Sequence, residues 1–374
     1  MAIRTTVTSP PLRRIAGSIA AAALSAAACV TAAGAHGGVA HGDDHHAVTV
    51  WTSWPLSPGV LLGLVLAAAV YGAGLWRTPR DGRGAGWPAL AFAGGLVALL
   101  AALQTPIEIA ADRVFVVHQI EHMLLQIIGP MLIMVAAPQA TLIRGLPAAA
   151  RRFARTVIAD SVLFAGLFRF LFHPALATVM FVAATWLWMV PRYHDAAILE
   201  APAHYAWHAT LVASGLIFFW RVFDPRPWPL GVSLPGRVAM LCVAAMAHIL
   251  PGVYLSLKQN VLYTAYGAAG RLWDLDALTD ERLGGLTMWI PGGMMFAAAA
   301  LAVVHTAMRR EDRDAARRNH AGAEASGIKA DTFRGDRRPA NRALAIGLAG
   351  FTVAVFLLAI TAAILYELGL ARHS

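Results

Sequence analysis

Long apolar runs alternate with polar links along most of the chain. Several runs approach about 20 residues, the length at which an α-helix crosses the hydrocarbon core of a bilayer. The pattern therefore predicts an all-α fold, a polytopic transmembrane helical bundle of about seven to eight spans. The expected spans are Val60–Trp76, Trp87–Leu103, Val117–Ala137, Ala175–Val190, His204–Arg221, Val238–Leu257, Leu286–Thr306 and Ala343–Leu368.

One further apolar stretch, Val157–Phe172, differs from these spans in its basic residues. It contains Arg169 and follows Arg151, Arg152 and Arg155. We expect it to lie in the membrane interface as an amphipathic helix. If it crossed the membrane instead, the orientation of every later span would be reversed.

Composition agrees with a membrane protein, because 58% of the residues are hydrophobic and only 14% are charged. Soluble domains contain about 25% charged residues. The net charge of +9 comes largely from arginines in a few connecting segments, which is typical of cytoplasmic loops and not of nucleic-acid binding. The two cysteines, Cys29 and Cys242, provide neither a disulfide framework nor a CxxC site. A metal site would therefore need histidines, with methionine or carboxylate help.

The first residues have the pattern of a secretory signal. Arg13 and Arg14 precede an alanine-rich apolar run, and an A-x-A cleavage pattern occupies residues 33–35. We therefore expect a signal peptide at residues 1–35; the alternative is an uncleaved first helix. Residues 36–57 then form a histidine-rich periplasmic tail, which either binds metal or serves only as a solubilising segment.

Arginines predict the orientation of the spans. They fall in alternate links, after spans one, three, five and seven, whereas the intervening links are short or acidic. Because cytoplasmic loops are enriched in basic residues, these links are expected in the cytoplasm of a bacterial inner-membrane protein, with the mature N-terminus in the periplasm. The expected organisation is a bundle at 58–308, a cytoplasmic Arg-rich loop at 309–342 and an extra C-terminal helix at 343–369.

Two histidine pairs carry the main chemical signal. His118 and His122 open the third span, and His204 and His208 open the fifth. Residues four apart share one helix face, so each pair forms one ridge. Imidazoles are costly in hydrocarbon, and an ionisable residue inside a membrane span indicates a functional site. Both pairs enter from the periplasmic face in the expected topology, which favours a shared metal or haem site.

Other candidate ligands lie at a similar expected depth. His194 falls in the link before the second pair, His248 in the sixth span, and Asp280 and Met288 near the start of the seventh. The alternatives are a histidine that only hydrogen-bonds between helices and methionine as apolar filler. A metal-bound imidazole also needs a partner for its second nitrogen. The candidate partners are Glu121, Asp112, Glu108, Asp195 and Asp280.

Several short motifs resemble one known family. They are HQIEHMLL at 118–125, GPML at 129–132, AAP at 136–138, HP at 173–174, HD at 194–195, the second histidine pair, and a stretch from Asp280 through the glycines 284–285 to MWIPG at 288–292. Together they resemble the CtaG family of cytochrome c oxidase assembly factors, over about Val60 to Met308. The resemblance implies a multi-span inner-membrane protein needed to make active haem-copper oxidase.

Three functions remain open from the sequence. The first is a non-enzymatic assembly factor that binds copper and passes it to a cytochrome c oxidase subunit, with periplasmic copper chaperones as further partners. The second is a copper transporter, in which Cys242 and Met246 continue the path toward an inner exit at His173 and His305. The third is a bis-histidine haem protein.

Overall fold

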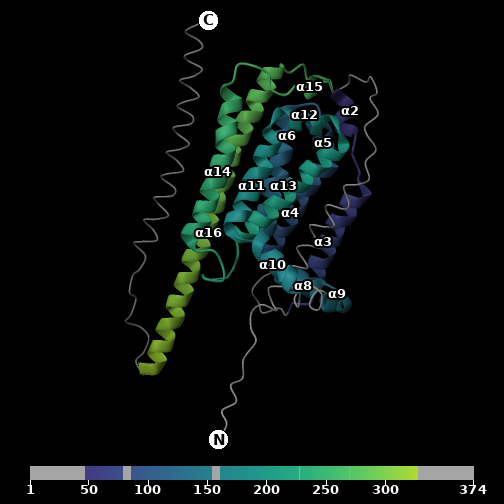
Figure 1. The fold of residues 1–374 in the computed structure, drawn as a ribbon. Helices are drawn as coiled ribbons and strands as arrows, with labels where there is room; N and C mark the ends of the chain where they lie inside the picture. The colour runs from purple at the N-terminus through teal and green to yellow at the C-terminus, as the bar shows by residue number, and fades with distance from the viewer. Residues whose placement is uncertain (1–46, 79–85, 154–160, 227, 269, 327–374) are drawn as a thin grey trace.

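The computed structural model describes residues 47–78, 86–153, 161–226, 228–268 and 270–326, and within these ranges all regular structure is helical (Figure 1). The all-α prediction is confirmed. The expected signal peptide, the histidines of the N-terminal tail and the expected last span lie outside the described residues. The helices are α2 (Ala47–Thr52), α3 (Pro58–Trp76), α4 (Gly86–Gln104), α5 (Pro106–Ala111), α6 (Phe115–His122), the π-helical segment η2 (Met123–Ile128), α7 (Gly129–Val135), α8 (Gln139–Gly145), α9 (Ala148–Phe153), α10 (Val162–Leu171), α11 (Pro174–Met189), α12 (Pro191–Leu199), α13 (Ala201–Val222), α14 (Leu234–Leu257), α15 (Ala265–Ala268) and α16 (Ala277–Ser326).

Five helical stretches are long and apolar enough to cross a membrane: α3, α4, the continuous stretch Phe115–Val135, α14 and α16. A sixth is possible if α10 and α11, which meet at a bend of 62°, form one broken span. Each expected span within the described residues coincides with a helix, including the long helix α13, but the count of seven to eight is not reached by these criteria. The chain is a multi-pass helical membrane protein.

The stretch Phe115–Val135 is the centre of the bundle, because 61% of it is buried, against 28% of α3. Its middle widens into η2, where the Gly129 amide bonds to the Leu124 carbonyl, five residues back. Pro130 gives the physical reason, since its ring nitrogen cannot donate to the Gln126 carbonyl and its ring crowds the preceding turn. A π-helical turn accommodates such a break without ending the helix. The central stretch therefore stays continuous next to its histidines.

Glycines allow neighbouring helices to approach this centre closely. A Cβ atom on Gly215 of α13 would lie 2.3 Å from the Gln126 carbonyl oxygen, and one on Gly95 of α4 would lie 2.8 Å from the Gly129 carbonyl oxygen. Such small-residue contacts are typical of helix packing in membranes, where van der Waals contact replaces the hydrophobic effect between helices. The backbones of α4 and α13 thus pack directly on the central stretch.

The largest helix contact joins α14 and α16. Gly252 of α14 faces Gly285 of α16, where a Cβ on Gly285 would lie only 2.7 Å from the Gly252 carbonyl oxygen. The glycine pair 284–285 therefore allows close packing, with Gly285 against α14 and Gly284 against Phe115. Beyond this contact α16 continues to Ser326, so the first part of the expected Arg-rich loop is helical.

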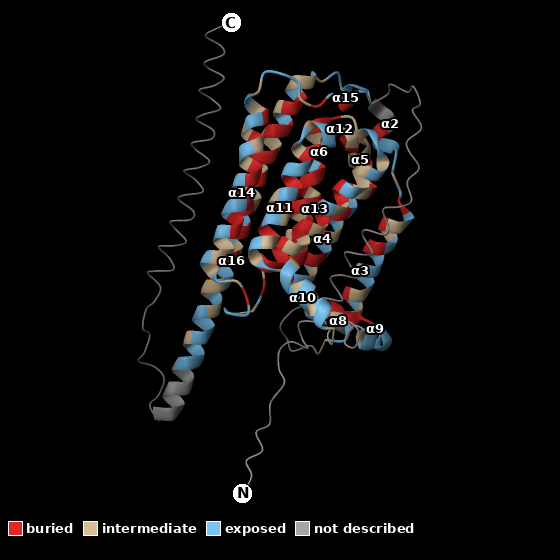
Figure 2. Cartoon of the chain, viewed as in Figure 1, coloured by how far each residue is buried: buried red, intermediate tan, exposed pale blue. Residues whose placement is uncertain are grey.

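Buried residues face the middle of the bundle, whereas the outward faces of the long helices are exposed (Figure 2). Those outward faces are largely apolar; the exposed side chains include Leu62 and Val65 of α3 and Val243 and Leu250 of α14. Helices that are apolar all round suit a lipid environment on one side and a protein core on the other. Figure 1 also shows two distinct ends, with α2, α5, α12 and α15 at one and α8, α9 and α10 at the other.

The glycine contact predicts a matched pair of stability effects on α16. Gly285→Ala forces α14 and α16 apart and should lower the free energy of unfolding by about 1–3 kcal/mol, the usual cost of overpacking. Gly293→Ala is the control, because its added Cβ meets only an Ile249 side-chain carbon at 3.9 Å. Thermal unfolding of the purified protein in detergent measures both. Equal midpoints for the two variants would contradict the packing.

Candidate metal centre

The two histidine pairs meet inside the bundle. On α6 the Nε2 atoms of His118 and His122 lie 2.6 Å apart, and on α13 those of His204 and His208 lie 3.0 Å apart. The rings of His122 and His208 have centroids 5.9 Å apart, which brings the two ridges face to face. The i,i+4 spacing places the two histidines of each pair on one face of their helix. The packing of α13 on the central stretch then brings the two pairs together.

A carboxylate completes a group of four potential ligands. His118, Glu121, His122 and His208 each offer one ligand atom, and these atoms lie within 4.8 Å of one another. All four side chains are buried. We call this group the histidine–glutamate cluster.

Glu121 is the unusual member of the histidine–glutamate cluster. Its side chain is 0% exposed, and neither carboxylate oxygen has a hydrogen-bond partner among the described residues. The nearest cationic candidate is His208, whose Nε2 lies 3.6 Å from Oε1, beyond hydrogen-bond distance. An unpaired buried carboxylate costs several kcal/mol, about the penalty that a bound cation would remove. The donor set of imidazoles and carboxylate fits a transition-metal ion.

A chain of hydrogen bonds fixes the protonation of His118. His194 Nδ1 lies 3.0 Å from the Trp188 carbonyl oxygen, which can only accept, so this nitrogen carries a proton. His194 Nε2 then accepts from the Tyr266 hydroxyl at 2.8 Å, and that hydroxyl in turn accepts from His118 Nδ1 at 3.0 Å. The direction of each bond follows from the one before it. His118 therefore presents the lone pair of Nε2 to the cluster.

The ionisation of the two outer groups agrees with this chain. Burial lowers the pKa of His194 to about 3, although its hydrogen bond to the Trp188 carbonyl acts in the opposite direction. Burial also raises the pKa of Tyr266 well above its ordinary value. At neutral pH the imidazole is therefore neutral and the phenol keeps the proton that it donates. Metal-bound histidines commonly use their second nitrogen in this way.

His118 and His122 share a proton in the absence of a metal ion. Because His118 Nε2 carries a lone pair, the 2.6 Å contact requires that His122 Nε2 donates to it. A metal ion bound by both Nε2 atoms would displace that proton. Trp207 packs against both rings, with centroid distances of 4.7 and 4.3 Å, and closes one side of the cluster.

Acidic side chains lie between the histidine–glutamate cluster and the exterior. Asp112 Oδ1 lies 3.4 Å from His204 Nδ1, and the Asp112 side chain is 34% exposed, against 12% for His204. Glu108 lines a cavity of about 50 Å³, together with Tyr205 and His208. Burial and the neighbouring Asp112 raise the pKa of Glu108 to about 8. At neutral pH Glu108 is therefore mostly protonated, and a cation bound beside it would displace that proton.

The other sequence-predicted ligands lie outside the group of four, although most of them are close to it. His204 adjoins it through His208, and His194 adjoins it through Tyr266. His248 and Met288 line a small cavity that also touches His122. Both oxygens of Asp280 accept hydrogen bonds elsewhere, which leaves this residue outside the group of four.

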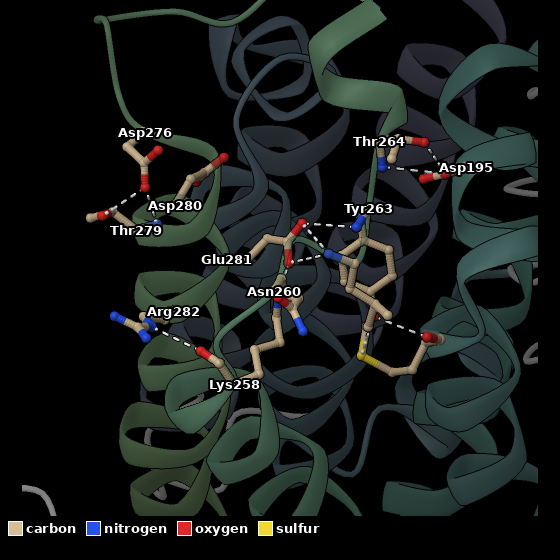
Figure 3. Close-up of polar contacts among 12 residues, drawn as sticks. Asp195, Lys258, Asn260, Tyr263, Thr264, Asp276, Thr279, Asp280, Glu281 and Arg282 are labelled. Carbon is tan, nitrogen blue, oxygen red and sulfur yellow. Dashed lines mark hydrogen bonds and ion pairs between the residues drawn. The ribbon is translucent and has the colours of Figure 1, made fainter. Parts of the chain in front are cut away.

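Asp280 and Glu281 hold the loop and helix ends above the cluster. Asp280 accepts from the backbone amides of Phe115 and Val116, at 2.8 and 2.9 Å, and pairs with Arg271 at 2.7 Å. It therefore caps α6 from a distant helix, at the end where an anionic group is stabilised by the helix dipole. Glu281, the next residue along α16, pairs with Lys258 at the same end of the bundle (Figure 3).

The segment after α14 is fixed in the same way. Glu281 accepts from the backbone amides of Leu262 and Tyr263, and Asp195 accepts from the amide and hydroxyl of Thr264 (Figure 3). These contacts carry the chain toward α15, which supplies Tyr266. Asp195, expected as a histidine partner, positions this loop instead.

Sequence reasoning missed Tyr266 and Trp207. Tyr266 lies 148 positions from His118, and no spacing rule links the two. Trp207 sits between the second pair of histidines but has no signature that distinguishes it from a lipid-facing tryptophan. Glu121 was expected as an orienting partner, whereas the structure places it among the potential ligands.

Comparison with known proteins identifies the family. A model of the cytochrome c oxidase caa3 assembly factor family (Caa3_CtaG) matches residues 69–310, which include the whole histidine–glutamate cluster. The chain belongs to this family. The suspected resemblance is confirmed, and the CtaG match ends within α16.

Curated relatives of this CtaG protein carry no functional description. Uncharacterized proteins of Mycobacterium bovis and Mycobacterium tuberculosis are each 26% identical over 280 residues, which cover 72% of this chain and 41% of theirs. One of Mycobacterium leprae is 22% identical over 281 residues, 72% of this chain and 42% of its own. The chain thus spans about two fifths of the length of these relatives. No solved structure matches.

The capping role of Asp280 predicts a large loss of stability on truncation. Asp280→Ala leaves two amides at the start of α6 without their acceptor and removes the partner of Arg271, so we expect a loss of about 3–5 kcal/mol. Asp276→Ala is the control, since this exposed residue bonds only locally to Thr279. Thermal unfolding should show a much smaller change there. A similar loss in both variants would contradict the assignment.

Proposed function

We propose that this CtaG protein is a non-enzymatic assembly factor that binds a copper ion at the histidine–glutamate cluster and passes it to a subunit of cytochrome c oxidase. The observation that carries the proposal is Glu121, a buried carboxylate without a hydrogen-bond partner in the described residues, surrounded by three imidazoles. A cation at this point satisfies both the carboxylate oxygens and the Nε2 lone pairs. Copper is here the cargo of the protein.

The donor set is compatible with copper but does not select it over zinc. Imidazole binds copper in both of its oxidation states, and it also binds zinc, iron and nickel. Membership in an oxidase assembly family favours copper, because haem-copper oxidases contain that metal. His118, His122, His208 and Glu121 would hold the ion. Tyr266 and His194 would keep His118 in the tautomer that binds.

The distribution of charge supports a periplasmic position for the cluster. Arg77 donates to backbone carbonyls at the end of α8, including that of Arg144, and Arg310 donates to the Pro225 carbonyl. This basic end of the bundle is the one opposite α12 and α15 (Figure 1). By the positive-inside rule the basic end faces the cytoplasm. The acidic approach through Asp112 then opens to the periplasm of the inner membrane, where copper chaperones would deliver the ion.

Two alternative functions receive less support. The expected transporter path needs ligands inside the bundle, but Cys242, Met246, His173 and His305 are all exposed. A haem needs a cavity larger than those beside the histidines, which measure about 20 and 50 Å³. An assembly factor that stores copper at one end of the bundle fits the observed placement best.

Removal of the first histidine pair tests the proposal directly. His118→Ala with His122→Ala should leave the protein inserted in the membrane but lower its copper content and abolish the oxidase activity that it supports. His173→Ala with His305→Ala is the control, because both residues are exposed and far along the chain from the cluster. Metal analysis and oxidase assays in the same membranes provide the readout. Full oxidase activity in the His118/His122 variant would refute the proposal.

Substitution of the carboxylate gives a second, independent test. Glu121→Gln keeps the shape of the side chain but removes the unpaired charge, so the metal-free variant should be at least as stable as the wild type. Copper should raise the unfolding temperature of the wild type, since a ligand stabilises the state that binds it. The variant should show little or no such increase. An equal increase in both proteins would contradict a role for Glu121 as a ligand.

A further inference from the structure

A second set of donor atoms lies next to the histidine–glutamate cluster, further along the central stretch. A cavity of about 20 Å³ is lined by His122, His248, Met123, Met189 and Met288, among others. This volume is about that needed for one water molecule or one ion. His122 belongs both to the cluster and to this cavity, so the two are contiguous.

His248 has the protonation that a ligand needs. Its Nδ1 lies 3.1 Å from the Ala244 carbonyl oxygen, which accepts, so Nδ1 carries the proton and Nε2 the lone pair. Phe181 and Phe296 pack against the ring at centroid distances of 5.6 and 5.2 Å. A backbone carbonyl on the second nitrogen is the common arrangement for a metal-bound histidine.

Two of the three methionines are available as ligands. The sulfur of Met189 accepts from the Tyr263 hydroxyl at 3.8 Å and already has a polar contact. Met123 and Met288 are 8% and 4% exposed and line the cavity from the central stretch and α16. Thioether sulfur is a soft donor that selects monovalent copper over harder cations.

An unsatisfied polar group beside the cavity indicates more than apolar filling. Gln119 is 3% exposed, and its Nε2 has no hydrogen-bond partner among the described residues. Gln126 and Thr185, which bond to each other at 3.1 Å, also line the space. Buried polar groups are nearly always satisfied, and the N–H groups of Gln119 need an acceptor, so they indicate a water molecule in this cavity that would also complete the ligands of an ion.

We propose that His248, Met123 and Met288 form a second metal site, selective for a monovalent soft cation such as Cu(I) or Ag(I). The site rests on the proposed function and extends it, because His122 lines both positions and allows an ion to move between them without entering bulk water. The cluster then receives the ion from the periplasmic side, and the sulfur site holds it as Cu(I) within the bundle.

X-ray absorption at the copper edge tests this site with the full chain loaded with Cu(I) under anaerobic, reducing conditions. The wild type should show sulfur neighbours around copper. Met123→Leu with Met288→Leu should lose them and bind about one equivalent of Ag(I) fewer per chain. Exchange of Met for Leu keeps the side-chain volume, so the variant should remain folded.

A matched control uses two exposed methionines, one of which lies on the same helix as Met288. Met246 of α14 and Met294 of α16 are 42% and 49% exposed, and their exchange for leucine should leave the sulfur signal intact. A wild-type spectrum with nitrogen and oxygen neighbours only would overturn the second site, as would a sulfur signal that survives in the Met123/Met288 variant. Either result would leave water as the occupant of the cavity.

Failure of the second site can be told apart from failure of the proposed function. His118→Ala with His208→Ala removes ligands of the cluster that do not line the cavity. If both sites exist, this variant loses part of its copper and keeps the sulfur signal. If it keeps all of its copper, the cluster is not a site, whereas the sulfur site stands.

Discussion

The carboxylate of Glu121 sets the constraint under which this bundle is built. It lies in the most buried of the candidate spans, beside three imidazoles, and neither of its oxygens has a hydrogen-bond partner among the described residues. In a low-dielectric interior such an arrangement is expensive, and the cost is tolerated only where a cation relieves it or a function requires it. The helices around the cluster therefore have to keep the Glu121 carboxylate and the imidazole lone pairs close together, although these groups repel one another.

Positioning of the cluster depends on contacts from several elements at once. Asp280 of α16 fixes the start of α6, while the π-helical turn after His122 lets the same helix pass Pro130 without a break. Tyr266 of α15 and His194 of α12 then determine which nitrogen of His118 points inward. Each contact acts on a different part of one helix, so the orientation of the histidines is set by the whole end of the bundle and not by α6 alone.

The two ends of the bundle differ in chemistry. The sequence places carboxylates and histidines in or beside α5 and α12, and arginines in or beside α8 and the far part of α16. Figure 1 shows α5 and α12 at the end of the bundle opposite α8. A basic end and a less basic end are what the positive-inside rule associates with the two sides of a membrane. Methionine side chains line the small cavity beside His122, and thioether sulfur is a softer donor than the imidazole nitrogen of the cluster.

The sequence by itself determined the helical membrane class, the approximate positions of the long apolar helices within the described residues and the family. Those features are local, because apolar length, the i,i+4 spacing of His118 and His122 and short motifs are read within one segment. Only the tertiary structure decided which side chains meet. Glu121 became a potential ligand because α13 brings His208 beside it, and Asp280 became a helix cap because α16 begins at the amides of α6. Contacts between segments that lie far apart in the chain depend on how the helices pack, and helical periodicity carries no information about that choice.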